Sequence, residues 1–487
     1  MLFLPSVQGR FPVGVTTFAT PVRPSRPIGS LKLRAPTHAS AQPALRLEEV
    51  AFTAYYPADT SSTHLIKGLD WFLRPLAESL RGFAIFLGVP SWLLWPVVYL
   101  FGALVKIPAY PNAPLLNPMD LNAFPATQPS VSSQWPLVIF SHGLGGSRTA
   151  YSQFCSRLAA SGKVVLAVEH RDGTGTLSMP RLWDVDGKST SKITYYLRDT
   201  DISWEDTTTS KEAQPLPLRA EQLAFRHHEM YLTYTTFSKF IQNDPDVEFE
   251  TIDSTEIDRQ SWSAADSKGK SIIQFDRDVI LAGHSFGGCT VLSLLSTRPE
   301  EGYQPIPIKQ AIILDPWLDP LPSPGPIPIS TSDSMPAHTT DIGSSKTSLD
   351  GITINTENGS SKALSPHPRM LVINSETFTL WKDHFERLRE VISGWEPDGK
   401  SILTLVGSQH VNFSDFPVLP IVHKKGARKI MNTIGTLSLA FLDGKLDQCL
   451  EEEVNTVKME INIVGVKKDG KPKRKLVGKI GDVIADY

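Results

Sequence analysis

Short apolar runs rich in β-branched residues recur along the chain and alternate with segments of helical periodicity. The apolar runs are Leu137–Ser141, Val164–Val168, Val279–Gly283, Ala311–Leu314, Met370–Ile373 and Ile402–Val406. Runs this short and this apolar are typical of strands that are buried on both faces. The segments with helical spacing are Tyr151–Ala160, Leu223–Ile241 and Cys289–Leu295. We therefore predict an α/β fold in which a mostly parallel central sheet is flanked by helices.

The two ends of the chain and one internal stretch depart from this pattern. Residues 1–45 are rich in Pro, Ser and Arg and have few large apolar residues after Phe18, which predicts a loosely ordered N-terminal extension. Residues 321–367 contain no aromatic side chain and are dominated by Ser, Thr, Pro and Gly, which predicts a flexible surface insertion. The predicted organisation is an α/β domain over 46–446, carrying that insertion, followed by a C-terminal extension over 447–487.

The composition favours a large globular protein over a nucleic-acid-binding one. The 487 residues are 41% apolar and 20% charged, and 48 basic against 51 acidic residues give a net charge of −3. One basic cluster, Lys467–Lys475, indicates either a solvated hairpin turn or a contact with anionic membranes. The three separated cysteines, Cys155, Cys289 and Cys449, form no disulfide framework, and no secretory signal opens the chain. These features predict a cytoplasmic protein, either free or peripheral on membranes.

A nucleophile motif follows the strand that begins at Val279. Residues Gly283–Gly288 read GHSFGG, a G-x-S-x-G sequence placed between a buried strand and a helix-compatible run. In that context the glycines allow a sharp turn, and the turn exposes the serine hydroxyl at a helix N-terminus. We predict that Ser285 is a nucleophile; the alternative is a serine with a structural role in a tight turn.

The ends of later strands supply a base and an acid for this serine. His410 follows the run Ile402–Val406 after a short Gly-Ser-Gln turn, and Asp315 directly follows Ala311–Leu314. The carboxyl ends of parallel strands meet at one edge of a sheet, so these side chains are expected beside Ser285. Glu376, after the next strand, is an alternative acid, because the order Ser, acid, His allows either position.

Two backbone N–H groups are needed to stabilise the oxyanion that forms when a serine attacks an ester. Phe286, directly after the nucleophile, offers one. Leu144, in the glycine-rich turn SHGLGG at Ser141–Gly146, offers the other, unless that turn is an ordinary strand-to-helix loop. No cluster with metal-ligand spacing and no cofactor motif is evident, so we predict acyl transfer to water through an acyl-serine, without metal or cofactor.

Six strings occur in a fixed order and carry a family resemblance: SHGLGGSR, AVEHRDGTG, GHSFGG, LDPW, INSE and GSQHVNFSDF. Together they resemble the platelet-activating-factor acetylhydrolase family, of the type related to the plasma enzyme, and the chain looks like a fungal-type member. The resemblance covers most of residues 80–445 outside the insertion. It implies an α/β-hydrolase fold.

The same resemblance implies particular roles for five residues. They are nucleophile Ser285, acid Asp315, base His410, and oxyanion donors Leu144 and Phe286.

The resemblance also implies an activity, and it selects Asp315 over Glu376 as the acid. The implied reaction is metal-independent hydrolysis of the sn-2 acetyl or short acyl ester of phospholipids such as platelet-activating factor. The implied partner is this phospholipid substrate, bound at a membrane or lipoprotein-like interface. Two alternatives stay open: a general carboxylesterase or lipase without phospholipid preference, and a catalytically idle lipid-binding protein. The sequence predicts no oligomeric state.

A long apolar segment, Gly82–Val105, is uncharged over 24 residues, which is enough to span a bilayer. Pro90 and Pro96 divide it into pieces shorter than a span. Three interpretations compete: an interfacial or acyl-binding cap, a buried core element, and a membrane span. Trp92 and Trp95 favour the first, because indole rings prefer interfaces.

Overall fold

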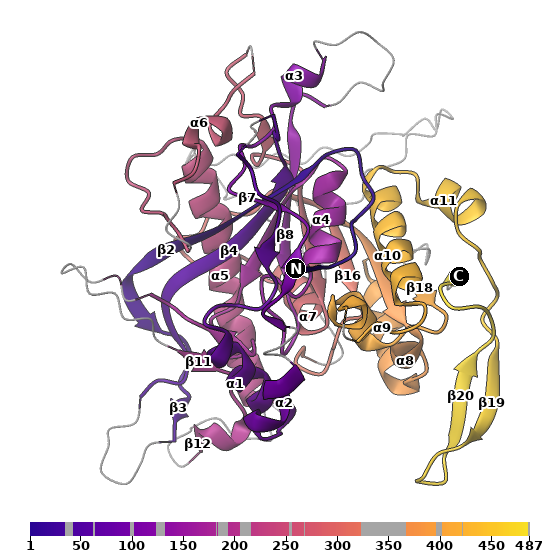
Figure 1. Cartoon of the computed structure of the whole chain (residues 1–487). Coiled ribbons are helices and arrows are strands. Elements are labelled where there is room, and N and C mark those ends of the chain that lie inside the picture. Colours follow the sequence, from indigo (N-terminus) through magenta and orange to yellow (C-terminus); the bar gives the residue numbers. More distant parts are fainter. Residues whose placement is uncertain are drawn as a thin grey trace, which may run out of the picture.

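A mixed sheet of twelve strands forms the centre of the part of the chain that the computed structural model describes, with helices against both faces (Figure 1). The described residues are 1–34, 42–61, 64–97, 102–122, 132–181, 183, 193–204, 216–252, 256–266, 268–322, 367–395, 402–420 and 422–485. The main path of the sheet runs β13-β2-β4-β9-β8-β15-β16-β17-β18-β21.

The six strands at the middle of the sheet are all parallel to one another. They are β8 (Trp135–Ser141), β9 (Val164–Glu169), β15 (Val279–His284), β16 (Ile308–Leu314), β17 (Arg369–Ser375) and β18 (Ile402–Leu405). Every residue of β9 and β15 is buried. The prediction of a parallel sheet made from apolar, β-branched runs is therefore confirmed.

The two faces of this sheet bury separate clusters of apolar side chains. On β15, Leu281 packs into the cluster on one face, and its neighbours Ile280 and Ala282 pack into the cluster on the other. The long helices that contribute to the first cluster are α5 (Pro217–Ile241), α7 (Phe286–Leu295) and α9 (Lys382–Ser393), and the short α6 (Arg259–Trp262) adds Trp262. Those contributing to the second are α1 (Leu76–Leu87), α4 (Ser152–Ala160), α10 (Ala427–Leu442) and α11 (Leu446–Glu452). The arrangement is that of a doubly covered α/β sheet.

The N-terminal residues form two long antiparallel strands at one side of the sheet. β2 (Val13–Pro27) pairs with β4 (Arg46–Pro57), and β4 pairs with β9. Phe18 of β2 is fully buried, and its ring lies 5.5 Å from that of Phe52. The prediction of a loosely ordered extension over 1–45 is therefore wrong for the described residues, because pairing with β4 orders a segment whose own sequence is a weak strand signal.

The C-terminal residues also take part in the sheet. β21 (Val483–Ala485) pairs antiparallel with β18 at the other edge. Before it, β19 (Ile461–Val466) and β20 (Pro472–Leu476) form a hairpin that projects from the body (Figure 1). A boundary at residue 446 therefore does not separate the chain into a domain and an appendage. The predicted insertion 321–367 lies, except at its two ends, outside the described residues.

The apolar segment 82–105 divides between core and surface. α1 buries Leu80 and Ala84 and ends at Gly88, whose φ of 70° suits glycine. The next helix, α2 (Ser91–Val97), exposes Trp92 by 70% and Trp95 by 44%. Among the described residues, no helix combines the length and the apolar character that crossing a bilayer requires.

The remaining elements are short, and they connect the parts described above. They are β1 (Leu2–Phe3), β3 (Lys32–Leu33), β5 (Leu69–Asp70), β6 (Val105–Ile107), β7 (Tyr110–Pro111), α3 (Pro118–Asn122), β10 (Leu177–Ser178), β11 (Thr194–Tyr195), β12 (Ile202–Ser203), β13 (Glu250–Thr251), α6 (Arg259–Trp262), β14 (Ile273–Gln274) and α8 (Glu376–Thr379).

Candidate active site

Ser285 occupies a sharp turn between β15 and α7. Its φ of 57° and ψ of −119° lie in a region that non-glycine residues rarely adopt. The turn is crowded: a Cβ on Gly283 would lie 2.3 Å from the carbonyl oxygen of Gly287, and a Cβ on Gly287 would lie 2.0 Å from that of Ser141. The glycines of GHSFGG are therefore needed for close backbone approach, which agrees with the predicted nucleophile turn.

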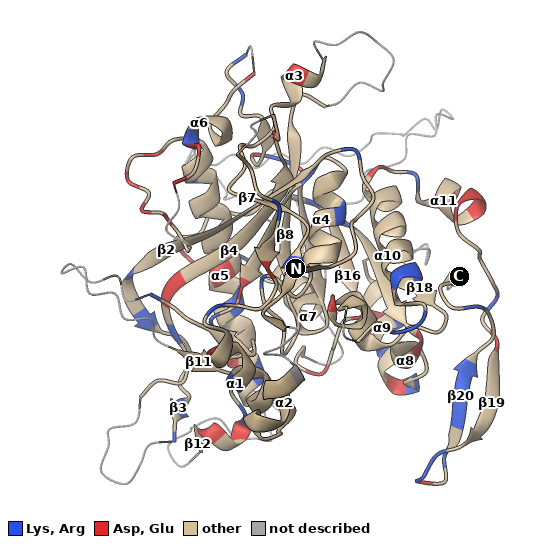
Figure 2. Ribbon diagram, viewed as in Figure 1, with Lys and Arg blue, Asp and Glu red and all other residues tan. Residues whose placement is uncertain are grey.

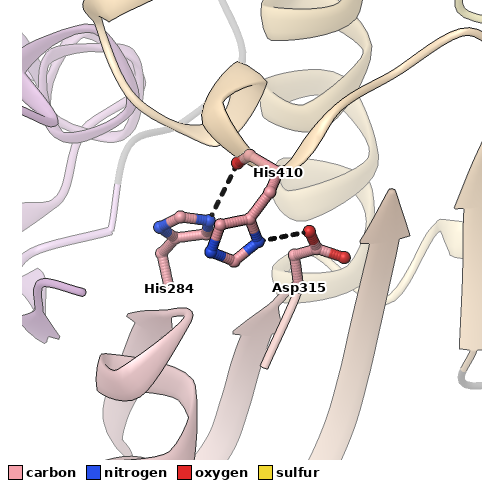
Figure 3. A group of neighbouring side chains, drawn as sticks. All are labelled: His284, Asp315 and His410. Atoms are coloured by element: carbon pink, nitrogen blue, oxygen red, sulfur yellow. Dashed lines mark hydrogen bonds and ion pairs between the residues drawn. The ribbon is translucent and has the colours of Figure 1, made fainter. Parts of the chain in front are cut away.

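The structure brings Ser285, His410 and Asp315 together at the carboxyl ends of the parallel strands. His410 Nε2 lies 2.9 Å from Ser285 Oγ, and His410 Nδ1 lies 2.6 Å from Asp315 Oδ2 (Figure 3 shows the His410–Asp315 contact). The other oxygen of Asp315 accepts the backbone N–H of Ser375 at 2.6 Å. The carboxylate is fully buried, whereas the His410 side chain is 35% exposed. The imidazole is therefore held by a buried partner and is still accessible from solvent.

Glu376, the alternative acid, has a different set of contacts. Its carboxylate accepts the backbone N–H of Gly407 at 2.5 Å and that of Leu476 at 3.2 Å. It therefore joins the turn after β18 to the end of β20, while Asp315 alone of the two contacts His410.

The glycine-rich turn after β8 lies directly against the serine. A Cβ on Gly143 would lie 2.8 Å from Ser285 Cβ and 3.3 Å from Ser285 Oγ. Within the described part of the chain, no acceptor takes the N–H of Leu144, although the N–H groups of Gly143 and Gly145 are bonded. Phe286 is the first residue of α7, so its N–H lacks a helical partner. Both predicted oxyanion donors are thus available beside Ser285.

A chain of hydrogen bonds connects this turn to the backbone of His410 through Tyr151 and His284. The Gly143 N–H donates to Tyr151 Oη at 3.2 Å, and Tyr151 Oη lies 2.8 Å from His284 Nδ1. His284 Nε2 lies 3.1 Å from the carbonyl oxygen of His410, a contact that Figure 3 shows. A carbonyl can only accept, so Nε2 of His284 carries the proton and Nδ1 accepts from the tyrosine. Burial, together with the nearby His410, lowers the pKa of His284 well below its usual value, which keeps this ring neutral.

A fully buried arginine holds the rear of the same turn. Arg226, on α5, donates to the carbonyl oxygen of His142 at 2.7 Å, to Asp172 Oδ2 at 2.8 Å and to Thr174 Oγ1 at 2.6 Å. Its guanidinium carbon also lies 4.5 Å from the ring centroid of Phe286. One side chain therefore fixes the oxyanion turn, the loop after β9 and the first residue of α7 relative to one another.

Sequence reasoning did not find Tyr151, His284 or Arg226. Tyr151 and Arg226 lie in or beside segments that read as ordinary amphipathic helices, and their partners are distant in sequence. The sequence does contain His284 inside the nucleophile motif GHSFGG and Asp172 inside the family string AVEHRDGTG, but neither motif predicts these hydrogen-bond partners.

The donor atoms of His284, Asp315 and His410 lie within 4.8 Å of one another, a spacing that a metal ion could use. Their present contacts point to proton transfer instead. His410 Nδ1 is committed to Asp315 and its Nε2 to Ser285, and an ion bound between these groups would displace both contacts.

A parallel sheet covered on both faces, with a serine turn after one strand and its acid and base after later strands, defines a protein of the α/β-hydrolase fold. Comparison of the sequence with family profiles gives a more particular assignment. The chain belongs to the family described as platelet-activating factor acetylhydrolase, isoform II, whose profile matches residues 2–325. Ser285 and Asp315 lie inside the matched range, and His410 lies beyond it.

Individual relatives are similar at low identity. The platelet-activating factor acetylhydrolase of Canis lupus familiaris is 26% identical over 371 residues, which cover 74% of this chain and 62% of the relative. That of Bos taurus is 30% identical over 282 residues, 55% of this chain and 50% of the relative. A fungal protein, from Schizosaccharomyces pombe, is 29% identical over 202 residues, 40% of this chain and 43% of the relative. The chain thus spans 62% of the Canis lupus familiaris protein and 50% of the Bos taurus protein.

Proposed function

We propose that this protein is a serine ester hydrolase that removes the sn-2 acetyl or short acyl group from phospholipids resembling platelet-activating factor. The observation that carries the proposal is the hydrogen-bonded set of Ser285, His410 and Asp315 beside the available N–H of Leu144. The substrate class rests on the names of the relatives, which are platelet-activating factor acetylhydrolases.

The first half of the reaction follows from these contacts. His410 Nε2 takes the proton of Ser285 as Oγ attacks the ester carbonyl, and Asp315 stabilises the resulting imidazolium through Nδ1. The N–H groups of Leu144 and Phe286 stabilise the negative charge on the former carbonyl oxygen. When the tetrahedral species collapses, the ester C–O bond breaks and the imidazolium returns its proton to the departing glycerol oxygen, which leaves an acyl-serine and a lysophospholipid.

The second half regenerates the serine. Water enters where the lysophospholipid left, and His410 Nε2 takes one of its protons as the water oxygen attacks the acyl carbon. Collapse of the second tetrahedral species releases the short carboxylic acid, and the proton on His410 returns to Ser285 Oγ. The proposed reaction needs no ion or cofactor, because His410 transfers the proton and the two N–H donors stabilise the oxyanion in both acylation and deacylation.

The apolar surface of α2 lies on the segment that covers the oxyanion turn, which supports a lipid substrate. A Cβ on Gly145 would lie 2.4 Å from Cζ of Phe86, so the end of α1 rests on this turn. Directly after it, Trp92 and Leu93 are 70% and 52% exposed. Exposed aromatic and aliphatic side chains next to the helix that contacts the oxyanion turn suit a protein that takes its substrate from a lipid surface. We therefore propose that the protein works peripherally on a membrane, from the cytoplasmic side.

A hydrolysis panel tests the proposed function. Phosphatidylcholines with sn-2 chains from acetyl to palmitoyl, nitrophenyl acetate and a triacylglycerol would be compared, with Ser285→Ala as the matched control. We expect the largest kcat/KM for the acetyl phospholipid and a steep decline with chain length. Equal turnover of simple esters and phospholipids would favour a general carboxylesterase or lipase. A wild-type protein that hydrolyses none of them and resists a fluorophosphonate would be a lipid-binding protein without catalysis.

A further inference from the structure

The β19–β20 hairpin exposes apolar side chains that no other part of the described chain covers. All six residues of β19 are exposed, and four of them are Ile or Val. Ile463 is 70% exposed and Val466 is 71% exposed. An isolated two-stranded hairpin is marginally stable in water, and β-branched residues on a strand normally pack against a neighbour. We therefore expect a binding partner to cover the exposed apolar side chains of the hairpin.

The same hairpin carries a concentrated positive charge. Six basic residues and one acid, Asp469, give the segment Lys467–Lys475 a net charge of +5, whereas the whole chain has a net charge of −3. The basic residues follow β20 and the tip of the hairpin (Figure 2). Within the part of the chain that the structure describes, none of these six side chains forms an ion pair with a carboxylate. The charge is thus free to act on an external anionic surface.

The base of the hairpin is fixed to the catalytic body. Leu476 is buried with Val406 and Ile484, and its N–H donates to Glu376. β21, which follows the hairpin, pairs with β18, the strand that leads to His410. The exposed strands are therefore held at a defined place beside the edge of the sheet that carries the catalytic histidine.

The hairpin and α2 both lie toward the lower side of the molecule in the view of Figure 1. A lipid surface could meet both at once, α2 through its indole rings and the hairpin through its lysines and aliphatic side chains. The segment 461–476 contains no aromatic residue on which a nucleic-acid base could stack. Aliphatic side chains among lysines match instead the boundary between acyl chains and anionic head groups.

We infer that the β19–β20 hairpin is a second membrane contact, specific for anionic lipid, which acts together with α2 to hold the catalytic residues close to the bilayer. The inference rests on the proposed function in one respect only, that the substrate lies in a membrane. The binding itself is measured without catalysis.

The test is co-sedimentation of the full-length protein with vesicles of phosphatidylcholine alone and of phosphatidylcholine and phosphatidylserine in equal parts. The charge variant replaces four lysines by glutamine: Lys468→Gln, Lys471→Gln, Lys473→Gln and Lys475→Gln. A matched control removes the same number of exposed lysines elsewhere: Lys239→Gln, Lys268→Gln, Lys270→Gln and Lys309→Gln. A third variant, Ile463→Thr with Val466→Thr, removes apolar surface and keeps residues that favour strands.

We expect wild type to bind the anionic vesicles more tightly than the neutral ones, and to lose this preference as salt is raised. Each lysine near an anionic surface contributes roughly fivefold to partitioning. The charge variant should therefore lose at least about tenfold in binding to the anionic vesicles and nothing on the neutral ones. The threonine variant should lose about threefold or more, in proportion to the apolar area removed. Turnover of nitrophenyl acetate should be unchanged in all three.

Two results would overturn the inference. One is a charge variant that binds anionic vesicles as tightly as the lysine control. The other is a wild-type dimer, seen by analytical ultracentrifugation, that the threonine variant loses while vesicle binding is kept, since the partner would then be a second copy. If the hairpin binds anionic vesicles as expected but the wild type hydrolyses no phospholipid, the proposed function fails and the membrane contact stands.

Discussion

The interior of the catalytic region and the surface formed by α2 and the β19–β20 hairpin differ in how far their side chains are buried and fixed by contacts. The polar side chains around Ser285 are fixed by hydrogen bonds: Arg226, Tyr151 and His284 are all buried and hydrogen-bonded. On α2 and the hairpin, side chains such as Trp92 and Ile463 face solvent without cover. The site around Ser285 holds its polar groups in fixed positions for proton transfer. α2 and the hairpin instead present exposed apolar side chains, and the hairpin also presents exposed positive charge.

From this difference and the proposed function, we expect that chemistry and lipid capture are separable in this protein. Substitutions inside the site should affect every ester equally, because all of them need the same nucleophile and oxyanion donors. Substitutions on α2 or the hairpin should affect only substrates presented in a bilayer. The predictions below test this separation, from the largest expected effect to the smallest.

Ser285→Ala should lower kcat by about 10⁶ on both soluble and vesicle-borne esters, since loss of a triad nucleophile removes the covalent route. Circular dichroism and the melting temperature should match those of wild type. A purified, folded variant that keeps a tenth of the activity would show that another group is the nucleophile.

Arg226→Met should lower the free energy of unfolding by about 3–5 kcal/mol, because it leaves the buried Asp172 carboxylate without its partner. The matched control is Arg23→Met, which breaks an exposed pair with Glu248 at 3.2 Å and should cost less than about 1 kcal/mol. Denaturant unfolding of both variants measures the difference. Equal losses would mean that Arg226 does not hold the oxyanion turn and its neighbours together.

Tyr151→Phe should lower kcat roughly tenfold with little change in KM, less than the ~10²–10³ cost of removing an oxyanion donor itself. The variant loses the hydroxyl that joins the oxyanion turn to His284. Tyr234→Phe, which removes another largely buried hydroxyl, bonded to the carbonyl oxygen of Phe275 at 3.1 Å, is the control. If both variants lost the same activity on nitrophenyl acetate, general packing would explain the effect better than positioning.

Trp92→Ser combined with Trp95→Ser should reduce hydrolysis of vesicle-borne phospholipid severalfold and leave nitrophenyl acetate hydrolysis unchanged. Burial of the two indoles at a lipid surface would contribute roughly 25 cal/mol per Å² of apolar area. Liposome co-sedimentation should show the matching loss of binding. Equal losses on the soluble and the vesicle substrate would place these residues in the catalytic core.

EDTA should leave the activity unchanged on either kind of substrate. The atoms of His284, Asp315 and His410 that could hold an ion are engaged in the hydrogen bonds described above, and proton transfer from Ser285 needs no Lewis acid. Activity that falls in EDTA and returns with zinc or calcium would refute the proposed mechanism.

The sequence predicted the parallel centre of the sheet well, and the reason is local. A strand buried on both faces, such as β15, must be apolar at every position, so its sequence identifies it without knowledge of its neighbours. The catalytic residues follow from the same logic, since Ser285 and Asp315 come directly after such a strand and His410 follows one after a short turn. Asp315 and Glu376 both meet this criterion; the family resemblance selects Asp315, and the contact of Asp315 with His410 agrees with that choice.

The edges of the sheet could not be predicted in this way. β2 contains Thr, Pro and Arg and is ordered by pairing with β4, which begins at Arg46, well beyond the end of β2 at Pro27. β21 has three residues, too few for any periodicity, and depends on β18. Tyr151 and Arg226 were missed for the same reason. Their roles arise from contacts with residues far away in the chain, which a pattern in one segment does not contain.

The central claim is that Ser285 forms the covalent intermediate, and mapping a fluorophosphonate adduct tests it most directly. The protein would be inactivated with the probe in the presence and absence of an acetyl phospholipid, and the modified peptide would be identified by mass spectrometry. We predict one adduct per chain, on Ser285, formed in step with the loss of activity, slowed by the lipid and absent from Ser285→Ala. Complete inactivation with the adduct on a different residue, or full activity in excess probe, would contradict the account.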